Sequence, residues 1–221
     1  MKIIGGHEVL TTIEELVDPK HTALVMIDVQ QDFTEPGMLT NAIWGEDAAL
    51  MKAALPNIAT AIKYARRAGV LPIFVQHTVK SDHITHSPVR IRNLTRELTV
   101  PDMKYGCIEN TPGWQLCGEI TPLPTEVVVR KGRASAFVGT DLDLILNMYD
   151  RKTIVLTGFL TNGCVLATTQ GAISRDYYTV IATDCIATSQ PDAHAAVLRY
   201  YELRHDTVTL PVLNRVWAAK A

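Results

Sequence analysis

Residues 153–184, TIVLTGFLTNGCVLATTQGAISRDYYTVIATD, decide the fold because they place a helical pattern between two apolar runs. The runs TIVLTG and YTVIATD are almost continuously apolar, which is typical of strands that are buried on both faces. The intervening CVLATTQGAISRD has a helical pattern. A strand, a helix and a second strand in this order form a βαβ unit with parallel strands. We therefore expect a parallel sheet covered by helices.

Further apolar runs and helical patterns extend this unit along the chain. The other runs are TALVMIDV (22–29), LPIFVQH (71–77), TEVVVRK (125–131) and DTVTL (206–210). Helical patterns occupy GTDLDLILNMYDR (139–151), SQPDAHAAVLRYYELRH (189–205) and the stripe made by Met51, Leu55, Ile58, Ile62 and Ala65. The alternation predicts an α/β fold, a three-layer α/β/α sandwich around a mostly parallel, six-stranded Rossmann-like sheet.

The segment 77–125 interrupts this alternation. It is rich in Pro, Asn, Asp and Thr, and a connection of this length inside a compact domain is usually functional. We expect an irregular insert that lines the site, with a short helix near residues 91–98. No repeat or linker divides the chain, so we predict a single domain over 1–221 with an N-terminal extension at 1–20.

Composition and charge narrow the class of protein. The 221 residues are 47% hydrophobic, and the formal net charge of −2 with no Lys/Arg run gives no case for binding nucleic acid. We find no apolar stretch of about 20 residues and no signal peptide, so we predict a cytoplasmic protein without membrane contact. The four cysteines lack a C-x-x-C pair and are interpreted as thiols, with a Cys107–Cys117 bridge left open.

Three reactive side chains stand where predicted strands end. Asp28 ends the first run, Lys131 ends the TEVVVRK run, and Cys164 follows TIVLTG at the start of a predicted helix. Ligands of open parallel sheets bind beyond the carboxyl ends of the strands, so the three converge on one edge. Each has an ordinary alternative, because Asp28 could cap a turn, Lys131 could be a solvated cation, and Cys164 could be a packed thiol.

The physical case for Cys164 is its expected place in the first turn of a helix. The positive end of the helix dipole and a nearby lysine lower a thiol pKa, and unpaired N–H groups there can receive an oxyanion. Gly163 would let the backbone approach a substrate closely.

Three segments, in order, resemble the signature segments of the isochorismatase-like cysteine hydrolases. They are ALVMIDVQQDF with Asp28, KGRASAFVGTDLDLIL with Lys131, and LTGFLTNGCVLATTQGA with Cys164, and the resemblance runs from about Thr22 to the C-terminus. It implies that Cys164 is the nucleophile, Asp28 the general base and Lys131 the cation that orients Asp28. It also implies a cis peptide bond at Phe159–Leu160, an oxyanion hole from the N–H groups of Leu160 and Cys164, and no cofactor.

The chain departs from this family in two places. Many relatives have Thr where this chain has Leu160, so we expect a more apolar pocket. Nicotinamidases carry an Asp-x-His motif that binds a metal, and Asp82, His83 and His86 do not have that spacing. We therefore predict no metal and interpret these three as polar loop residues.

The resemblance implies an amidohydrolase that cleaves an amide or ureide of a small molecule through a thioester. Candidate substrate-binding residues are Phe33, Gln76, His77, Trp114, Arg133 and Asn162. Alternatives are a nicotinamidase or isochorismatase-type hydrolase, a catalytically silent binding protein of the same fold, and a thiol redox protein, which would need a resolving cysteine such as Cys185. Relatives imply a homodimer or homotetramer.

Overall fold

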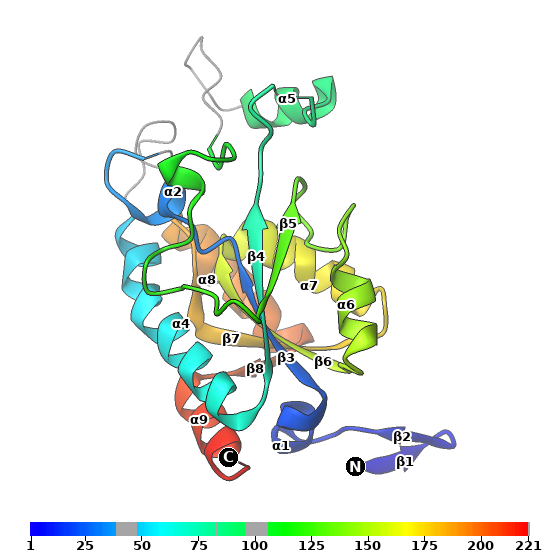
Figure 1. Ribbon diagram of the computed structural model, residues 1–221. Helices are drawn as coiled ribbons and strands as arrows, with labels where there is room; N and C mark the ends of the chain where they lie inside the picture. Colours follow the sequence, from blue (N-terminus) through cyan, green and yellow to red (C-terminus); the bar gives the residue numbers. More distant parts are fainter. Residues whose placement is uncertain (39–47, 83, 96–105, 221) are drawn as a thin grey trace.

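The computed structural model describes residues 1–38, 48–82, 84–95 and 106–220, and six of its strands form one parallel sheet (Figure 1). The sheet order is β5-β4-β3-β6-β7-β8, and every neighbouring pair is parallel. Its strands are β3 (Thr22–Ile27), β4 (Leu71–His77), β5 (Val127–Lys131), β6 (Thr153–Phe159), β7 (Tyr178–Ala187) and β8 (Asp206–Val208). The predicted α/β fold with a six-stranded sheet is confirmed, and the sheet is parallel throughout.

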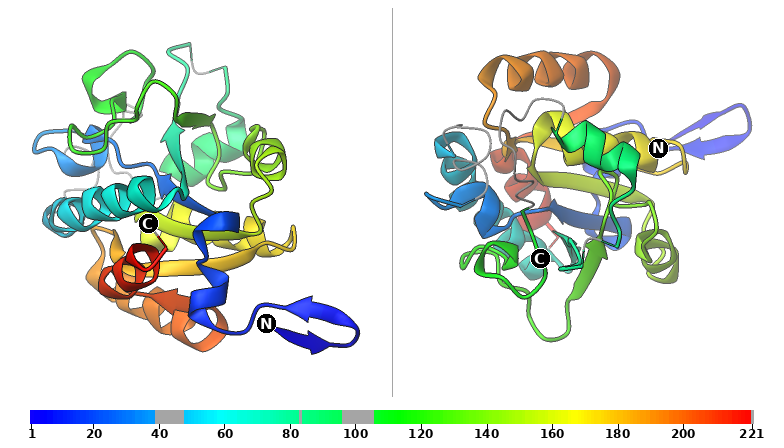
Figure 2. Two further views of the ribbon diagram at one scale, coloured as in Figure 1. Left: turned by 60° about the horizontal axis from the view of Figure 1, so that its bottom comes forward. Right: turned by 90° about the horizontal axis from the view of Figure 1, so that it is seen from above.

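Helices cover both faces of this sheet (Figures 1 and 2). One face packs against α4 (Ala49–Ala68) and α9 (Leu210–Ala218), and the other packs against α6 (Leu142–Met148), α7 (Leu166–Ile173) and α8 (Pro191–Arg204). The result is the predicted three-layer sandwich.

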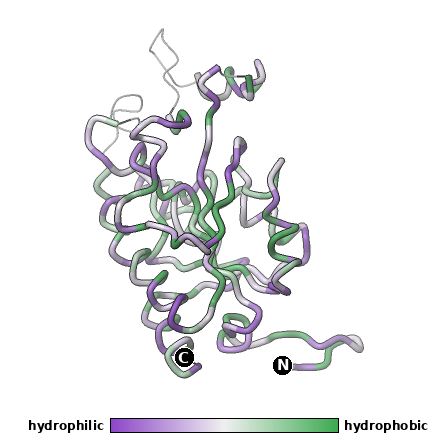
Figure 3. The backbone as a smooth tube through the Cα atoms, viewed as in Figure 1, coloured by the Kyte–Doolittle hydropathy of each residue, from purple (hydrophilic) through white to green (hydrophobic). Residues whose placement is uncertain are grey.

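Strand β3 shows why the apolar runs form the middle layer. Its residues alternate between the two cores, with Leu24 and Met26 on the α4 side and Ala23, Val25 and Ile27 on the α7 side. All are buried, so the strand needs apolar residues at every position. Hydrophobic residues accordingly gather along the central strands in Figure 3. All five residues of the predicted stripe on α4 are buried as well.

The insert lies at the carboxyl end of the sheet. It contains α5 (Pro88–Thr95), above the ends of β4 and β5 in Figure 1, and the 3₁₀ turn η2 (Pro112–Trp114), which packs against α2 (Gln31–Thr34). The helix predicted at 91–98 begins three residues earlier than expected, at Pro88, and residues 96–98 lie outside the described residues.

The N-terminal extension forms structure of its own. It consists of the hairpin β1 (Lys2–Ile4) and β2 (His7–Val9), the short helix α1 (Ile13–Leu16) and the 3₁₀ turn η1 (Pro19–His21). The hairpin projects from the body and turns at Gly5 and Gly6, which both have positive φ (Figures 1 and 2). None of the described helices is long and apolar enough to cross a membrane.

Candidate active site

The candidate site forms where β3, β5 and β6 end, and the long Lys131 side chain joins its parts. β4 separates β5 from β3, so Lys131 reaches across the end of β4. Its Nζ lies 2.8 Å from Oδ2 of Asp28 and 3.2 Å from Sγ of Cys164. The side chains of Asp28 and Lys131 are 0% exposed, whereas Cys164 is partly exposed. The structure therefore brings the three predicted reactive residues together, and Cys164 is the one among them that is partly exposed.

The backbone turns sharply at Asp28. Its φ is +52°, a left-handed conformation that Asp tolerates better than most residues. The Asp28 N–H donates to the carbonyl of Val75 at 2.9 Å, and its carbonyl accepts from the N–H of Gln30 at 2.8 Å. Both bonds fix the backbone of Asp28, which carries the carboxylate at the end of β3.

Cys164 lies at the start of a helix, in the π-helical turn η3 (Thr161–Val165) that connects β6 to α7 without a break before Leu166. Gly163, whose φ of −121° and ψ of −106° are non-helical, forms a kink inside this turn just before the cysteine. The peptide bond between Phe159 and Leu160, just before this turn, is cis. The turn is anchored to α8 because Thr161 Oγ1 and His194 Nδ1 lie 2.9 Å apart.

The protonation state of Cys164 differs from our expectation of a lowered thiol pKa. Burial raises the pKa of Cys164 to about 12, because its effect and that of Asp28 outweigh the opposing effect of Lys131. Burial also raises the pKa of Asp28, although Lys131 opposes the shift. Burial disfavours the charge on Lys131, but Asp28 and Cys164 outweigh it and raise the Lys131 pKa. At neutral pH Cys164 is thus a thiol, beside a carboxyl group whose pKa is raised.

Three of the predicted substrate-binding residues lie beside this group. His77 pairs with Lys131 in the sheet, and its Nδ1 is 3.4 Å from Lys131 Nζ. The carbonyl of Arg133 accepts from Lys131 Nζ at 2.9 Å. Asn162 belongs to the same turn as Cys164, and its Nδ2 donates to Oε1 of Gln190 at 3.0 Å.

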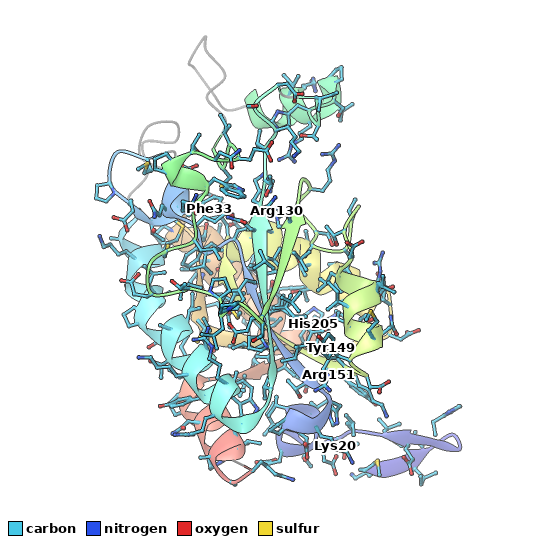
Figure 4. The ribbon with its side chains drawn as sticks, viewed as in Figure 1. Lys20, Phe33, Arg130, Tyr149, Arg151 and His205 are labelled. Atoms are coloured by element: carbon cyan, nitrogen blue, oxygen red, sulfur yellow. The ribbon has the colours of Figure 1, made fainter. Side chains whose placement is uncertain are left out.

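The other three lie on the α4 side of the sheet. Phe33 on α2 is buried in the core cluster of that side (Figure 4). The Gln76 amide donates to the carbonyl of Trp114 at 2.8 Å, and the Trp114 indole donates to Thr78 Oγ1 at 3.0 Å. Gln76 and Trp114 also line a cavity of about 710 Å³ along β5, whose lining includes none of the three reactive residues. Arg130, labelled in Figure 4, also lines this cavity and lies over the Trp114 ring.

Two residues near the site were not predicted. Gln30 bridges the ends of β3 and β4, because its amide bonds both the N–H and the carbonyl of His77. Arg90 on α5 contacts the His77 ring, with Nη2 3.1 Å from Nε2. Gln30 directly follows the apolar run 22–29, which was a signal available in the sequence, whereas the position of Arg90 depends on the path of the insert.

The structure also bears on the possible disulfide and on the possible metal ligands. All four cysteines are free thiols, so the Cys107–Cys117 bridge that was left open does not form. Among the residues that the structure describes, no group of three His, Cys, Asp or Glu side chains could hold a metal ion. His83, one of the residues interpreted as loop positions, lies outside them.

Comparison with known proteins agrees with this architecture. The family model of the isochorismatase domain matches residues 22–210. Ureidoacrylate amidohydrolase RutB of Cronobacter turicensis is 29% identical over 180 residues, which are 78% of this chain and 77% of that protein. A cysteine hydrolase from Pseudomonas syringae pv. phaseolicola has the same fold, with a TM-score of 0.78 at 22% identity over 93% of this chain and 96% of that one. An isochorismatase family protein from Desulfovibrio vulgaris has a TM-score of 0.74 at 27% identity, over 90% of this chain and 98% of that one.

Proposed function

The chain belongs to the isochorismatase family, and from this premise we propose that it is a cysteine-dependent amidohydrolase that cleaves a C–N amide or ureide bond of a small molecule. One observation carries the proposal: Lys131 Nζ contacts both the Asp28 carboxylate at 2.8 Å and the Cys164 thiol at 3.2 Å. A base, a cation and a nucleophile at one point are the groups that acyl transfer requires. The similarity to a ureidoacrylate amidohydrolase supports an amide or ureide as the substrate.

In the first half of the reaction, Asp28 takes the proton of the Cys164 thiol and the thiolate attacks the carbonyl carbon. The N–H groups of Leu160 and Cys164 receive the negative charge that develops on the carbonyl oxygen. The C–N bond then breaks as Asp28 returns its proton to the leaving nitrogen, which departs as ammonia or an amine. A thioester on Cys164 remains.

In the second half, Asp28 takes a proton from water and the hydroxide attacks the thioester carbon. The C–S bond breaks, the acid leaves, and Asp28 returns the proton to Cys164. Lys131 keeps Asp28 in place and balances its charge while the carboxylate passes the proton. The raised pKa of Asp28 supports this scheme because it makes the carboxylate a stronger base, and the raised pKa of Cys164 means that the neutral thiol needs such a base to form the thiolate.

We expect Leu160 to provide an apolar wall for the substrate, and Asn162 and His77 to provide hydrogen-bonding groups. Asn162 belongs to the turn that carries Cys164, and the His77 ring neighbours Lys131. Arg133 adds a planar cation suited to a substrate carboxylate. Contacts of Phe33, Gln76 and Trp114 with the substrate stay predictions.

The test is ammonia release from nicotinamide, ureidoacrylate, biuret and maleamate by the wild type, Cys164→Ala, Cys164→Ser and Cys185→Ala. Cys185 is a buried thiol in the core and serves as the matched control. We expect turnover of at least one compound, its loss in both Cys164 variants and its retention in Cys185→Ala, with a thioester adduct on Cys164 in the mass spectrum. Normal turnover by Cys164→Ala would refute the nucleophile, and turnover of nicotinamide alone would identify a nicotinamidase.

A further inference from the structure

The imidazole of His77 lies between two cationic side chains, Lys131 and Arg90. Nδ1 is 3.4 Å from Lys131 Nζ, and Nε2 is 3.1 Å from Arg90 Nη2. Gln30 fixes the backbone beneath the ring, since it accepts from the His77 N–H at 2.7 Å and donates to the His77 carbonyl at 3.0 Å. The ring is thus held at a defined place between α5 and β5.

The contact with Arg90 determines which nitrogen carries the proton. A guanidinium only donates, so Nε2 of His77 must accept. A neutral imidazole has one accepting nitrogen, and the proton therefore resides on Nδ1. While Arg90 occupies the Nε2 lone pair, the ring cannot take a second proton there.

The contact with Lys131 is of a different kind. An ammonium group has three protons, and Lys131 Nζ has three closer acceptors, in Asp28 at 2.8 Å, the Arg133 carbonyl at 2.9 Å and Cys164 at 3.2 Å. His77 Nδ1 is the fourth and most distant neighbour. A neutral His77 ring can lie beside Lys131 Nζ, whereas a protonated ring would put a second positive charge against the lysine.

The charges that face the ring act in the same direction. Burial lowers the pKa of His77 well below its ordinary value, and Lys131, Arg90, His86 and Arg133 lower it further. These groups come from β5, from α5, and from the segments that precede α5 and follow β5. The Asp28 carboxylate is paired with Lys131.

We propose that His77 is a positioning residue: its neutral ring holds the Arg90 guanidinium at a fixed place, and because the ring carries no charge it puts no imidazolium against Lys131. The role of His77 in turnover rests on the proposed function, whereas the contacts of its ring with Arg90 and Lys131 do not. In this arrangement α5 is docked through the Arg90–His77 contact, and the positive charge of Arg90 is separated by one imidazole ring from Lys131, which contacts Cys164. The positive charge of Arg90 attracts reagents and substrates that carry negative charge.

One experiment follows the His77 ring directly. We would record the pH titration of its NMR signals, assigned with His77→Gln, in the wild type, Arg90→Met and Arg92→Met. Arg92 is an exposed residue of the same helix and provides the matched control. We expect the His77 midpoint well below pH 6.5 in the wild type and in Arg92→Met, and a midpoint that rises toward 6.5 in Arg90→Met. An unchanged midpoint in Arg90→Met would overturn the proposal.

A second experiment compares alkylation of Cys164 by anionic iodoacetate and neutral iodoacetamide. The Gln side chain can place an acceptor near Nε2, whereas Asn reaches only the Nδ1 position. We therefore expect His77→Gln to retain the wild-type ratio of the two rates, and His77→Asn and Arg90→Met to lower it about fivefold. Equal ratios in His77→Gln and His77→Asn would show that Arg90 is not held by this ring. Neither measurement needs turnover, so failure of the proposed function in the Cys164→Ala test is distinguishable from failure of this inference.

Discussion

The Asp28–Lys131 ion pair has no contact with solvent, and each charge depends on the other. Removing one partner of a buried pair leaves the second charge uncompensated, which typically costs about 3–5 kcal/mol. We therefore expect Asp28→Asn to lower the free energy of unfolding by about that amount, measured by urea denaturation. The asparagine has nearly the same shape, so the loss would report charge and not packing.

The double variant Asp28→Asn/Lys131→Met isolates this cause. It removes both charges, and uncharged residues of similar volume often restore stability at such places. We expect it to be more stable than Asp28→Asn alone and to lack hydrolase activity. A double variant that is less stable than either single variant would contradict this account of the pair.

The protonation state of Cys164 can be measured by its reactivity. With a pKa of about 12, the thiolate fraction of Cys164 grows about tenfold with each pH unit throughout the neutral and alkaline range. We expect iodoacetamide to label Cys164 ahead of the three buried cysteines, with a rate that still rises between pH 7 and pH 10. A plateau below pH 9 would instead indicate a preformed thiolate.

Asp28→Asn should change reactivity and turnover in opposite directions. The Asp28 carboxylate raises the Cys164 pKa, so its removal favours the thiolate and should accelerate alkylation at pH 8. Turnover should disappear because the general base is lost. The comparison uses folded protein, checked by circular dichroism, and a slower alkylation in this variant would contradict the assigned charges.

At the scale of elements, β6 approaches β3 closely at Gly158. Its φ is +103°, and a Cβ atom there would clash with the backbone of Ile27, next to Asp28. We expect Gly158→Ala to lower the free energy of unfolding by roughly 3 kcal/mol or more, from left-handed strain together with the clash. Urea denaturation measures this loss, and alkylation of Cys164 reports whether the site survives.

Gly69→Ala separates strain from the clash. Gly69 ends α4 with a φ of +76°, but a Cβ atom there meets nothing within 4 Å. This variant should lose only about 1–2 kcal/mol, the cost of the left-handed conformation itself. Equal losses at the two positions would show that the contact between β6 and β3 is not tight.

The sequence was sufficient to predict the elements of the sheet because a strand buried on both faces must be apolar throughout. The run LPIFVQH corresponds to β4 residue for residue, and the other five runs each contain most of a strand. The N-terminal hairpin was not predicted as such, because its exposed residues follow no buried pattern. Packing leaves a periodic signal in the sequence, and an exposed hairpin does not.

The site was predictable to a lesser degree. The ends of parallel strands share one edge, so the meeting of Asp28, Lys131 and Cys164 could be anticipated. The turn that carries Cys164 could not, because the unusual ψ of Gly163 leaves no periodic trace. The thiol pKa depends on burial in three dimensions, and Arg90 on the path of the insert, so both required the structure.

At the scale of the whole molecule, the two ends of the chain differ in how they are attached. Trp217 on α9 is fully buried, and its indole donates to the Val17 carbonyl at 2.9 Å. The hairpin at the other end is exposed, with Ile3 68% accessible. The stability of the fold should therefore depend strongly on α9 and little on the hairpin.

We expect Trp217→Ala to cost about 3–5 kcal/mol through the cavity that it leaves, and deletion of residues 2–9 to change the free energy of unfolding by less than about 1 kcal/mol. Urea denaturation gives both values, and the alkylation rate of Cys164 in the deletion variant should equal that of the wild type because the hairpin lies far from the carboxyl end of the sheet (Figure 1). A large loss of stability on deleting the hairpin, dependent on protein concentration, would mean that its exposed apolar residues are covered by a second chain in solution, since association makes stability depend on concentration.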